Sequence, residues 1–494
     1  MKIKAFLLSL ALLLTACTGL WGCTRYEPVA LMPGYTEETE GETLPKTAEV
    51  APIAASSEDQ SESIEIESSK EPVKVKGIYL GASPCGMDDF MDRVIKRIDE
   101  TELNAVVIDV KDDFGRITYD MQSVPLVNEI GAVDVKIGDI KALTDKLHEH
   151  GIYCIARVVA FRDPYIAEQR PDLALHLSDG SLFRDNKGDA WVNPYKKEVW
   201  DYLVDIGKAA GDAGFDEIQF DYIRFCTERG INDVVYDEND TLGRGKTDII
   251  TEAVSYMSEK LREEGLFVSC DVFGTIIGSD IDAQSVGQDY GEMAEELDYI
   301  CPMIYPSHYA SGNFGLEHPD KAPYETILGA LTRSKSELAW SKKEDSPQAT
   351  VRPWLQSFTA SYLGEGNYME YDEAAVRAQI QAVYDAGYDE WLLWSASANY
   401  FYDGFLTPEE EAAENQQIEE SRAALPPETY ENAEELMNEQ SGVSSTLSEE
   451  LEDALENGEL SESDRAILSE SGDIIISETA ETSLPAEGRV SEEQ

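Results

Sequence analysis

Between about residues 73 and 425 the chain repeats one pattern: a short apolar run, a polar loop and an amphipathic helical segment. The runs are apolar on both faces, which is typical of parallel strands that are covered on both sides. Eight runs are present, at residues 77–80, 105–110, 153–161, 218–225, 267–273, 299–305, 351–358 and 391–395. Eight alternating strand–helix units predict an α/β fold, a closed (β/α)8 TIM barrel.

The segments between the runs carry apolar residues at helical spacing. In residues 88–101, for example, Phe90, Val94 and Ile98 share one face. Helices are expected at residues 88–101, 136–150, 199–213, 247–264 and 374–386, and a further helix begins at Pro408. A doubly wound open sheet is the alternative, but the Gly-Ala-Ser-Pro segment after the first run is not a glycine-rich phosphate loop.

Charge separates the ends of the chain from its middle. The 494 residues are 42% hydrophobic and carry a formal net charge of -59, so a nucleic acid is not an expected partner. Residues 24–72 hold 12 acidic and 3 basic side chains, and residues 408–494 hold 26 acidic and 3 basic ones. We therefore expect a disordered acidic linker at 18–72, a barrel domain at 73–425 and a mostly disordered acidic tail at 426–494. An acidic interaction module is the alternative for the tail.

The N-terminus has the pattern of an export signal. Two lysines precede an apolar run at residues 5–14 that is too short to span a membrane as a stable helix. Leu-Thr-Ala-Cys at residues 14–17 resembles a bacterial lipobox, so residues 1–17 are predicted to be a lipoprotein signal peptide and Cys17 the acylated residue. An ordinary signal peptide is the alternative, and Cys23 is a poorer acceptor because the bulky Trp21 precedes it. Acylation would anchor the chain to the outer face of the bacterial cell membrane.

Polar and aromatic residues gather where the predicted strands end, which is where TIM barrels hold their reactive groups. The candidates for substrate binding are Asp109, Asp112, Arg157, Tyr222, Arg224, Tyr305, His308, Trp354, Gln356 and Trp394. Aromatic faces offer platforms for sugar rings, and aspartate and arginine bind hydroxyl groups. The alternative for Trp354 and Trp394 is that they only fill the mouth of the barrel.

Two aspartates are the candidates for catalysis. Asp221 is the candidate nucleophile or stabilising carboxylate, held ionised by Arg157 or Arg224, although a structural Asp–Arg pair is the alternative. Asp271, on the next strand, is the candidate acid/base, because aromatic residues around it can raise its pKa. Asp109 is the rival for either role and can instead bind a substrate hydroxyl.

Other chemistries fit less well. The chain has five histidines, and the His-Glu-His segment at residues 148–150 lies at the end of a helix on the opposite rim, so no metal is expected. Nucleophile-elbow and phosphate-loop motifs are absent from the sequence, and no cofactor is expected. The five cysteines after Cys23 lack metal-binding spacing and are expected to be buried thiols, although a disulfide is possible outside the cell.

Five segments carry a family resemblance: Lys-Gly-Ile-Tyr-Leu at 76–80, Val-Ile-Asp-Val-Lys-Asp at 107–112, Gln-Phe-Asp-Tyr-Ile-Arg-Phe at 219–225, Asp-Val-Phe-Gly at 271–274 and Cys-Pro-Met-Ile-Tyr-Pro-Ser-His-Tyr at 301–309. Together they resemble a bacterial family of inferred glycoside hydrolases, long described only as a domain of unknown function and found in secreted or lipid-anchored proteins. The resemblance covers residues 73–402 and implies a glycosidase-type TIM barrel. Cys226 departs from the proline that is common in other members.

The predicted function is hydrolysis of an extracellular or cell-wall polysaccharide by paired carboxylates. The alternative is a non-catalytic carbohydrate-binding surface lipoprotein, which needs the aromatic platforms but not several acids at the strand ends. The expected partners are the polysaccharide and the membrane that holds the anchor. The protein is expected to be a monomer.

The anchor can be tested directly. Mass spectrometry of the mature protein should find an N-terminus at Cys17 with added acyl mass, and Cys17→Ser should abolish the modification. Cys23→Ser is the matched control and should leave it unchanged. A mature chain that begins elsewhere and carries no acyl mass would contradict the lipoprotein prediction.

Overall fold

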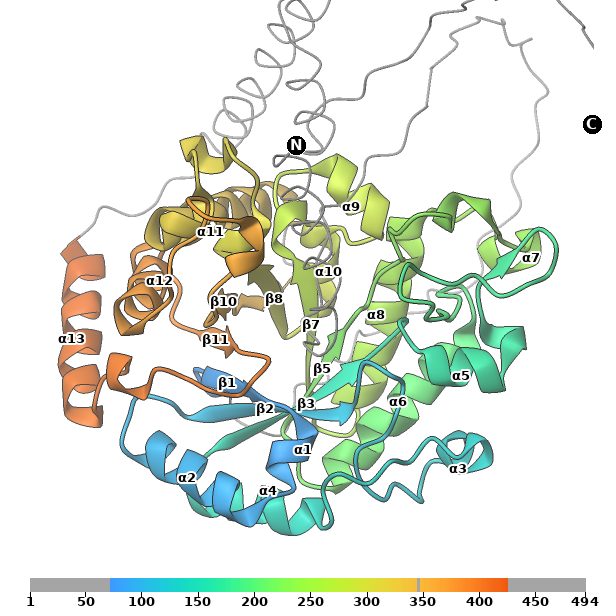
Figure 1. Ribbon diagram of the computed structural model, residues 1–494, viewed down its shortest axis with the longest axis horizontal. Helices are drawn as coiled ribbons and strands as arrows, with labels where there is room; N and C mark the ends of the chain where they lie inside the picture. The colour runs from blue at the N-terminus through green and yellow to red at the C-terminus, as the bar shows by residue number, and fades with distance from the viewer. Residues whose placement is uncertain (1–71, 344–346, 425–494) are drawn as a thin grey trace, which may run out of the picture.

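The structure is a computed structural model that describes residues 72–343 and 347–424, and its parallel strands close into a barrel (Figure 1). The eight strands of the wall are β1 (Lys76–Leu80), β2 (Ala105–Lys111), β3 (Tyr153–Val159), β5 (Glu217–Asp221), β7 (Phe267–Phe273), β8 (Tyr299–Ile304), β10 (Trp354–Gln356) and β11 (Trp391–Trp394). They pair in this order, and closure is completed where β8 pairs with β10 and β11 pairs with β1. The predicted (β/α)8 TIM barrel is confirmed.

Helices surround the strands on the outside (Figure 1). The longer ones are α2 (Asp88–Asp99), α4 (Ile140–Glu149), α6 (Lys197–Asp212), α8 (Lys246–Arg262), α11 (Pro323–Ser341), α12 (Glu373–Asp385) and α13 (Pro408–Ala424). Shorter ones are α1 (Ala82–Cys85), α3 (Pro125–Ile130), α5 (Pro164–Gln169), α7 (Glu238–Thr241), α9 (Asp280–Val286) and α10 (Tyr290–Glu296). All the expected helices are present, with their ends shifted by a few residues.

The helix α11 was not expected from the sequence, although it has 19 residues. Its buried face includes Thr326, Ser334 and Ser336 among the aliphatic residues. These small polar side chains interrupt the apolar stripe by which an amphipathic helix is recognised.

Two predicted strands differ most from their apolar runs. The run at 218–225 was interpreted as one strand, but β5 ends at Asp221 and Tyr222 has a φ of 51°. The run at 351–358 is divided into β9 (Thr350–Val351), which pairs with β8, and β10. Proline at position 353 explains this division, because it has no N–H to donate to a neighbouring strand.

The loops that follow β3 and β5 are longer than a simple barrel needs. Within them β4 (His176–Leu177) and β6 (Val234–Val235) form a two-stranded antiparallel sheet. Side chains of this sheet pack against a second, smaller cluster of buried side chains that includes Trp191, Tyr222 and Cys226. The loops therefore build a packed extension next to the end of β5.

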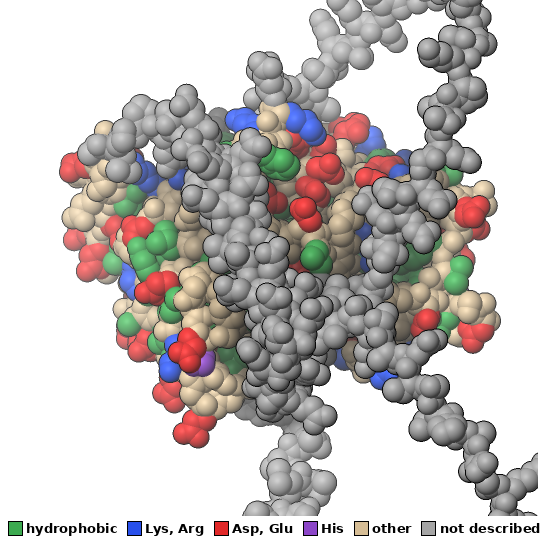
Figure 2. Space-filling model, turned by 90° about the horizontal axis from the view of Figure 1, so that it is seen from above, with side chains coloured by type: hydrophobic (Ala, Val, Ile, Leu, Met, Phe, Trp, Pro, Cys, Tyr) green, Lys and Arg blue, Asp and Glu red, His purple; other side chains and the backbone are tan. Residues whose placement is uncertain are grey.

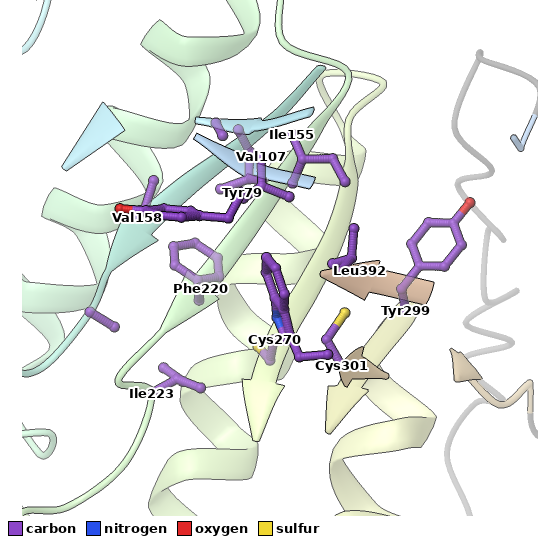
Figure 3. Close-up of a cluster of buried hydrophobic side chains, with 14 of the residues drawn as sticks. Tyr79, Val107, Ile155, Val158, Phe220, Ile223, Cys270, Tyr299, Cys301 and Leu392 are labelled. Carbon is purple, nitrogen blue, oxygen red and sulfur yellow. The ribbon is translucent and has the colours of Figure 1, made fainter. Parts of the chain in front are cut away.

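The core lies inside the barrel and between its wall and the helices. Figure 3 shows part of it, with Tyr79, Phe220, Cys270 and Leu392 projecting from four different strands. The five described cysteines, Cys85, Cys154, Cys226, Cys270 and Cys301, are buried and none forms a disulfide. The interpretation of these cysteines as buried thiols is confirmed.

A buried ion-pair cluster closes the end of the barrel where the strands begin. Arg352 is fully buried, and its Nη1 lies 2.8 and 2.9 Å from the two carboxylate oxygens of Glu217. Its Nε donates to Glu390 at 2.8 Å, and its guanidinium lies 3.6 Å from the centre of the Tyr299 ring. Two carboxylates and one arginine thus join β5, β8 and the segments before β10 and β11.

The ends of the chain lie outside the described residues. This applies to the predicted signal peptide with Cys17, to nearly all of the acidic linker and to the acidic tail. Among residues 72–343 and 347–424, none of the helices combines the length and the hydrophobicity that a membrane span requires. Acidic side chains are spread over the described surface that Figure 2 shows.

Loss of the buried arginine should destabilise the fold strongly. Arg352→Met leaves two buried carboxylates without their cation, and we expect it to cost about 3–5 kcal/mol of unfolding free energy. Arg93→Met, at an exposed position of α2, is the control and should change stability by no more than about 0.5 kcal/mol. Urea denaturation of the two variants measures the difference, and equal losses would contradict a structural role for the cluster.

Candidate active site

Arg157 lies at the centre of the polar groups at the C-terminal rim of the barrel. It is 1% exposed and contacts three carboxylates. Its Nη1 donates to Asp109 at 2.7 Å, its Nη2 lies 3.3 Å from Asp113, and its Nε and Nη2 donate to Asp221 at 2.9 and 2.6 Å. One guanidinium therefore holds side chains from β2, the loop after β2 and β5 in a fixed arrangement.

Asp221 is fixed by its backbone as well as by Arg157. Its Oδ1 accepts a hydrogen bond from the backbone N–H of Tyr222 at 2.6 Å, and its carbonyl accepts from Ala160 at 2.7 Å. The left-handed conformation of Tyr222 costs on the order of 1–3 kcal/mol and turns the chain away from the strand directly after the acid. Strained backbone at this point is typical of a functional position.

Asp271, at the same level of the adjacent strand, has a different environment. It is 2% exposed and makes no ion pair with a described residue, and its Oδ1 accepts the indole N–H of Trp354 at 2.6 Å. Burial first, and the nearby negative charge of Asp221 second, raise the pKa of Asp271 well above its usual range. Because Oδ1 accepts the indole N–H, the proton of the neutral acid belongs on Oδ2.

The two acids stand side by side on the rim. The pairing of β5 with β7 aligns Phe220 with Cys270, and the next residue of each strand is Asp221 and Asp271. Paired strands lie about 4.8 Å apart. Two like charges so close disfavour each other, and this repulsion contributes to the raised pKa of Asp271.

Asp109 is the third acid of the site. It accepts hydrogen bonds from the Tyr79 hydroxyl at 2.5 Å and from Arg157. Burial and the charge of Asp113 raise its pKa to about 6, while Arg157 and Tyr79 act in the opposite direction. Both of its oxygens are engaged by protein groups, which suits a positioning role better than proton transfer.

Aromatic rings border these acids. Trp394 is half-buried and stacks on Tyr79 with ring centres 4.1 Å apart, and it meets Trp354 edge-on at 5.7 Å. Trp354 is 1% exposed and is held by its bond to Asp271. Trp394 is thus the partly exposed ring of the two, whereas Trp354 positions an acid.

Several other predicted residues are engaged within the protein. Asp112 accepts the backbone N–H groups of Phe114 and Arg116 at 2.9 Å and so shapes the loop after β2. Gln356 is fully buried, and its side chain binds Asp320, Ser307 and the carbonyl of Phe358.

Tyr305 and His308 follow β8 and lie edge-on to one another with ring centres 5.1 Å apart. Burial lowers the pKa of His308 to about 4 and raises the pKa of Tyr305 well above its usual range. Both side chains are therefore neutral at pH 7, and His308 is not a cationic ligand there.

Of the two cations suggested as the partner of Asp221, Arg157 forms the ion pair and Arg224 does not. Arg224 donates through Nη1 to the carbonyl of Phe225 at 2.8 Å, and Arg157 is the cation that pairs with Asp221. Residues three positions apart project from opposite faces of a regular strand, and the positive φ of Tyr222 ends the strand before Arg224.

Three residues of the site were not among the candidates. Tyr79 binds Asp109, and Asp113 contacts both Arg157 at 3.3 Å and Arg162 at 3.6 Å. Arg162 also donates to the Tyr222 hydroxyl at 3.2 Å. Tyr79 lies within an apolar run, and Asp113 and Arg162 follow one, but the sequence does not tell which of the adjacent Asp112 and Asp113 turns toward Arg157.

One group of described residues has the composition of a metal site, and it is at the opposite end of the barrel. His148, Cys154 and Asp216 offer ligand atoms within 4.8 Å of one another. His148 and Asp216 are hydrogen-bonded at 2.8 Å, which is closer than the spacing of about 3.3 Å between two ligands of a tetrahedral zinc ion. The contact fits a hydrogen bond at the start of the strands.

The fold and the acid-rich rim define a TIM barrel of the glycosidase type. Residues 77–400 match the family described as "Putative glycosyl hydrolase domain". The match covers more than half of the chain, and the chain belongs to this family. The resemblance seen in the sequence motifs is confirmed.

Solved structures with similar folds include a hypothetical protein from Ruminiclostridium thermocellum, 37% identical over 40% of this chain and 97% of its own, with a TM-score of 0.37. The glycoside hydrolase domain of PgaB from Bordetella bronchiseptica is 11% identical over 72% of this chain and 100% of its own, with a TM-score of 0.46. The spore cortex-lytic enzyme SleL of Bacillus megaterium is 12% identical over 68% and 74%, with a TM-score of 0.39. No curated protein matches the chain.

Trp354 should control the titration of Asp271. Its N–H stabilises the charged carboxylate and so acts to lower the pKa, which means that Trp354→Phe should raise the pKa of Asp271 further. Carbon-13 NMR of the side-chain carboxyl groups measures this, with Asp271→Asn to assign the signal. Trp391→Phe, which removes an N–H bonded to Tyr384 instead, is the matched control. A titration that moves to lower pH in Trp354→Phe would contradict the assignment.

Proposed function

We propose that the protein is a glycoside hydrolase that cleaves an extracellular or cell-wall polysaccharide with Asp221 and Asp271. The observation that carries the proposal is the contrast between these neighbouring acids. Arg157 compensates the charge of Asp221, whereas burial and Asp221 itself favour the neutral form of Asp271. Glycosidases need such a pair, one carboxyl group that can give a proton and one that is charged.

In the first step Asp271 gives its proton to the glycosidic oxygen as the bond from that oxygen to the anomeric carbon breaks. Asp221 stabilises the positive charge on the sugar or forms a bond to the anomeric carbon from its carboxylate. A water molecule then gives a proton to Asp271 while its oxygen bonds to the anomeric carbon, which restores both acids. The spacing of adjacent strands, about 4.8 Å, favours the retaining course, for which the carboxyl groups lie about 5–5.5 Å apart.

The remaining groups of the rim have supporting roles in this proposal. Arg157 and Tyr79 orient Asp109, which binds a hydroxyl group of the sugar. The half-buried face of Trp394 supports a sugar ring from its apolar side. Trp354 fixes the orientation of the acid.

The place of action that we propose is the outer face of the bacterial cell membrane. The lipobox at residues 14–17 and the acidic segment at 18–72 support it, because a charged, extended linker would hold the barrel away from the membrane. The barrel would thereby reach polysaccharide in the cell wall.

Reducing-sugar release from a panel of polysaccharides tests the reaction. Asp221→Asn and Asp271→Asn should each lower kcat by about 10²–10⁴-fold, because each removes a group that acts on the reacting bond. Asp298→Asn makes the same change at the opposite end of the barrel, where Asp298 pairs with Arg262, and should keep kcat within about twofold.

Two results would contradict the proposal. Near-native turnover in Asp221→Asn would mean that the acid is structural. Binding to the panel without any release, and with unchanged affinity in Asp221→Asn, would instead favour a non-catalytic carbohydrate-binding lipoprotein.

A further inference from the structure

One buried arginine at the rim has no acidic partner. Arg224 is 8% exposed, and its Nη1 donates to the carbonyl of Phe225 at 2.8 Å. Among the described residues, no carboxylate forms an ion pair with it and no acceptor binds its Nε or Nη2. A buried charge is costly unless it is paired, so this arrangement calls for an explanation.

The other buried arginines of the described chain do have such partners. Arg157 contacts three carboxylates, Arg352 contacts Glu217 and Glu390, and Arg162 donates to Asp189 at 2.9 Å. Among the buried arginines of the described residues, Arg224 thus differs from the others in having no carboxylate partner.

Aromatic rings hold the Arg224 guanidinium in place. Its central carbon lies 4.6 Å from the ring centre of Phe273 and 5.2 Å from those of Trp191 and Tyr222. Cation–π contacts of this kind stabilise an arginine partly, without neutralising its charge. Tyr222 follows Asp221 directly, and Phe273 lies two residues after Asp271, so two of these rings come from the segments that carry the candidate catalytic acids.

The open edge of Arg224 has the shape that recognises a carboxylate. The parallel N–H groups of Nε and Nη2 match the two oxygens of a carboxylate. In this structure Arg157 uses the same edge to bind Asp221, with Nε and Nη2 both donating to its Oδ2. The side chain of Arg224 remains 8% exposed, so part of it is accessible to solvent.

We infer that Arg224 binds a carboxylate group of the glycan, so that the substrate is an acidic polysaccharide with a carboxylate-bearing sugar at the cleaved bond or next to it. This inference rests on the proposed function, because the position of the cleaved bond is taken from the proposed roles of Asp221 and Asp271. Arg224 is then a specificity residue. It forms charge-assisted hydrogen bonds with the carboxylate of an acidic sugar, and a neutral sugar cannot form these bonds.

The charge of the whole chain makes this local cation more important. A net charge of -59 repels an anionic polymer at long range, although salt screens that repulsion beyond about 8 Å at physiological ionic strength. An acidic glycan therefore needs a positive group within the site itself. Arg157 and Arg162 are already paired with carboxylates of the protein. Arg224 is therefore the buried arginine of the rim that can bind the acidic glycan.

The test compares acidic polysaccharides with their own neutral forms. Polygalacturonate, hyaluronan and peptide-free glycan strands of peptidoglycan are each used before and after chemical reduction of their carboxyl groups to alcohols. Affinity is measured by calorimetry and cleavage by reducing-sugar release, with the full-length protein. We expect at least one acidic form to be bound and cleaved better than its reduced form.

Arg224→Met keeps the side-chain length but removes the charge and the N–H groups. It should reduce affinity and kcat/KM for the acidic form by about tenfold to hundredfold and change those for the reduced form little. Arg224→Lys, which keeps the charge without the paired N–H edge, should recover only part of the loss. Arg97→Met on α2, an arginine that lies over Tyr402 outside the barrel, is the control.

The outcomes separate this inference from the proposed function. Arg224-dependent binding of an acidic form without any cleavage supports the inference and contradicts the proposed hydrolysis. Cleavage of glycans with no preference for the acidic form of any pair overturns the inference and leaves the hydrolysis standing. The preference is measured on the wild-type protein, so it is decided even if an Arg224 variant folds poorly. Arg224-dependent binding of a phosphate-bearing polymer in place of the carboxylated ones also overturns the inference.

Discussion

The rim of this barrel depends on the contacts of Arg157. Its burial would cost several kcal/mol without partners, and the carboxylates of Asp109, Asp113 and Asp221 supply them. The dependence is mutual, because without the guanidinium three acids from neighbouring segments would repel each other in a buried site. The geometry of the candidate active site therefore depends on the buried guanidinium of Arg157 and on the three carboxylates that contact it.

The same constraint produces two unlike acids on adjacent strands. Asp221 takes the hydrogen bonds of Arg157, and Asp271 is left with an indole N–H and an apolar surrounding. Burial and the nearby charge then favour the neutral form of Asp271. Asp221 and Asp271 lie on adjacent strands but have different partners. Their environments therefore differ in the way that the two acids of a glycoside hydrolase must differ.

Much of the fold and part of the site could be predicted from the sequence. The eight runs and the acids at their ends were recognisable, because burial on both faces leaves a continuous apolar run and barrel chemistry lies at strand ends. The sequence left Arg157 and Arg224 open as the partner of Asp221, and the choice between them was not recognisable because it depends on a contact between neighbouring strands. The roles of Asp112 and Asp113 were likewise decided by a turn that binds the first and leaves the second to Arg157.

By itself the sequence determined the alternation of strands and helices, the acidic character of the chain ends and the identity of many of the residues at the rim. These features depend on periodicity and composition, which are local. Only the tertiary structure decided that Arg157 would join Asp109 and Asp221, that Trp354 would hold Asp271, and that Arg224 would stand among aromatic rings without an acid. Each of these contacts joins different strands or loops, so it depends on the register and closure of the barrel and leaves no periodic signal in the chain.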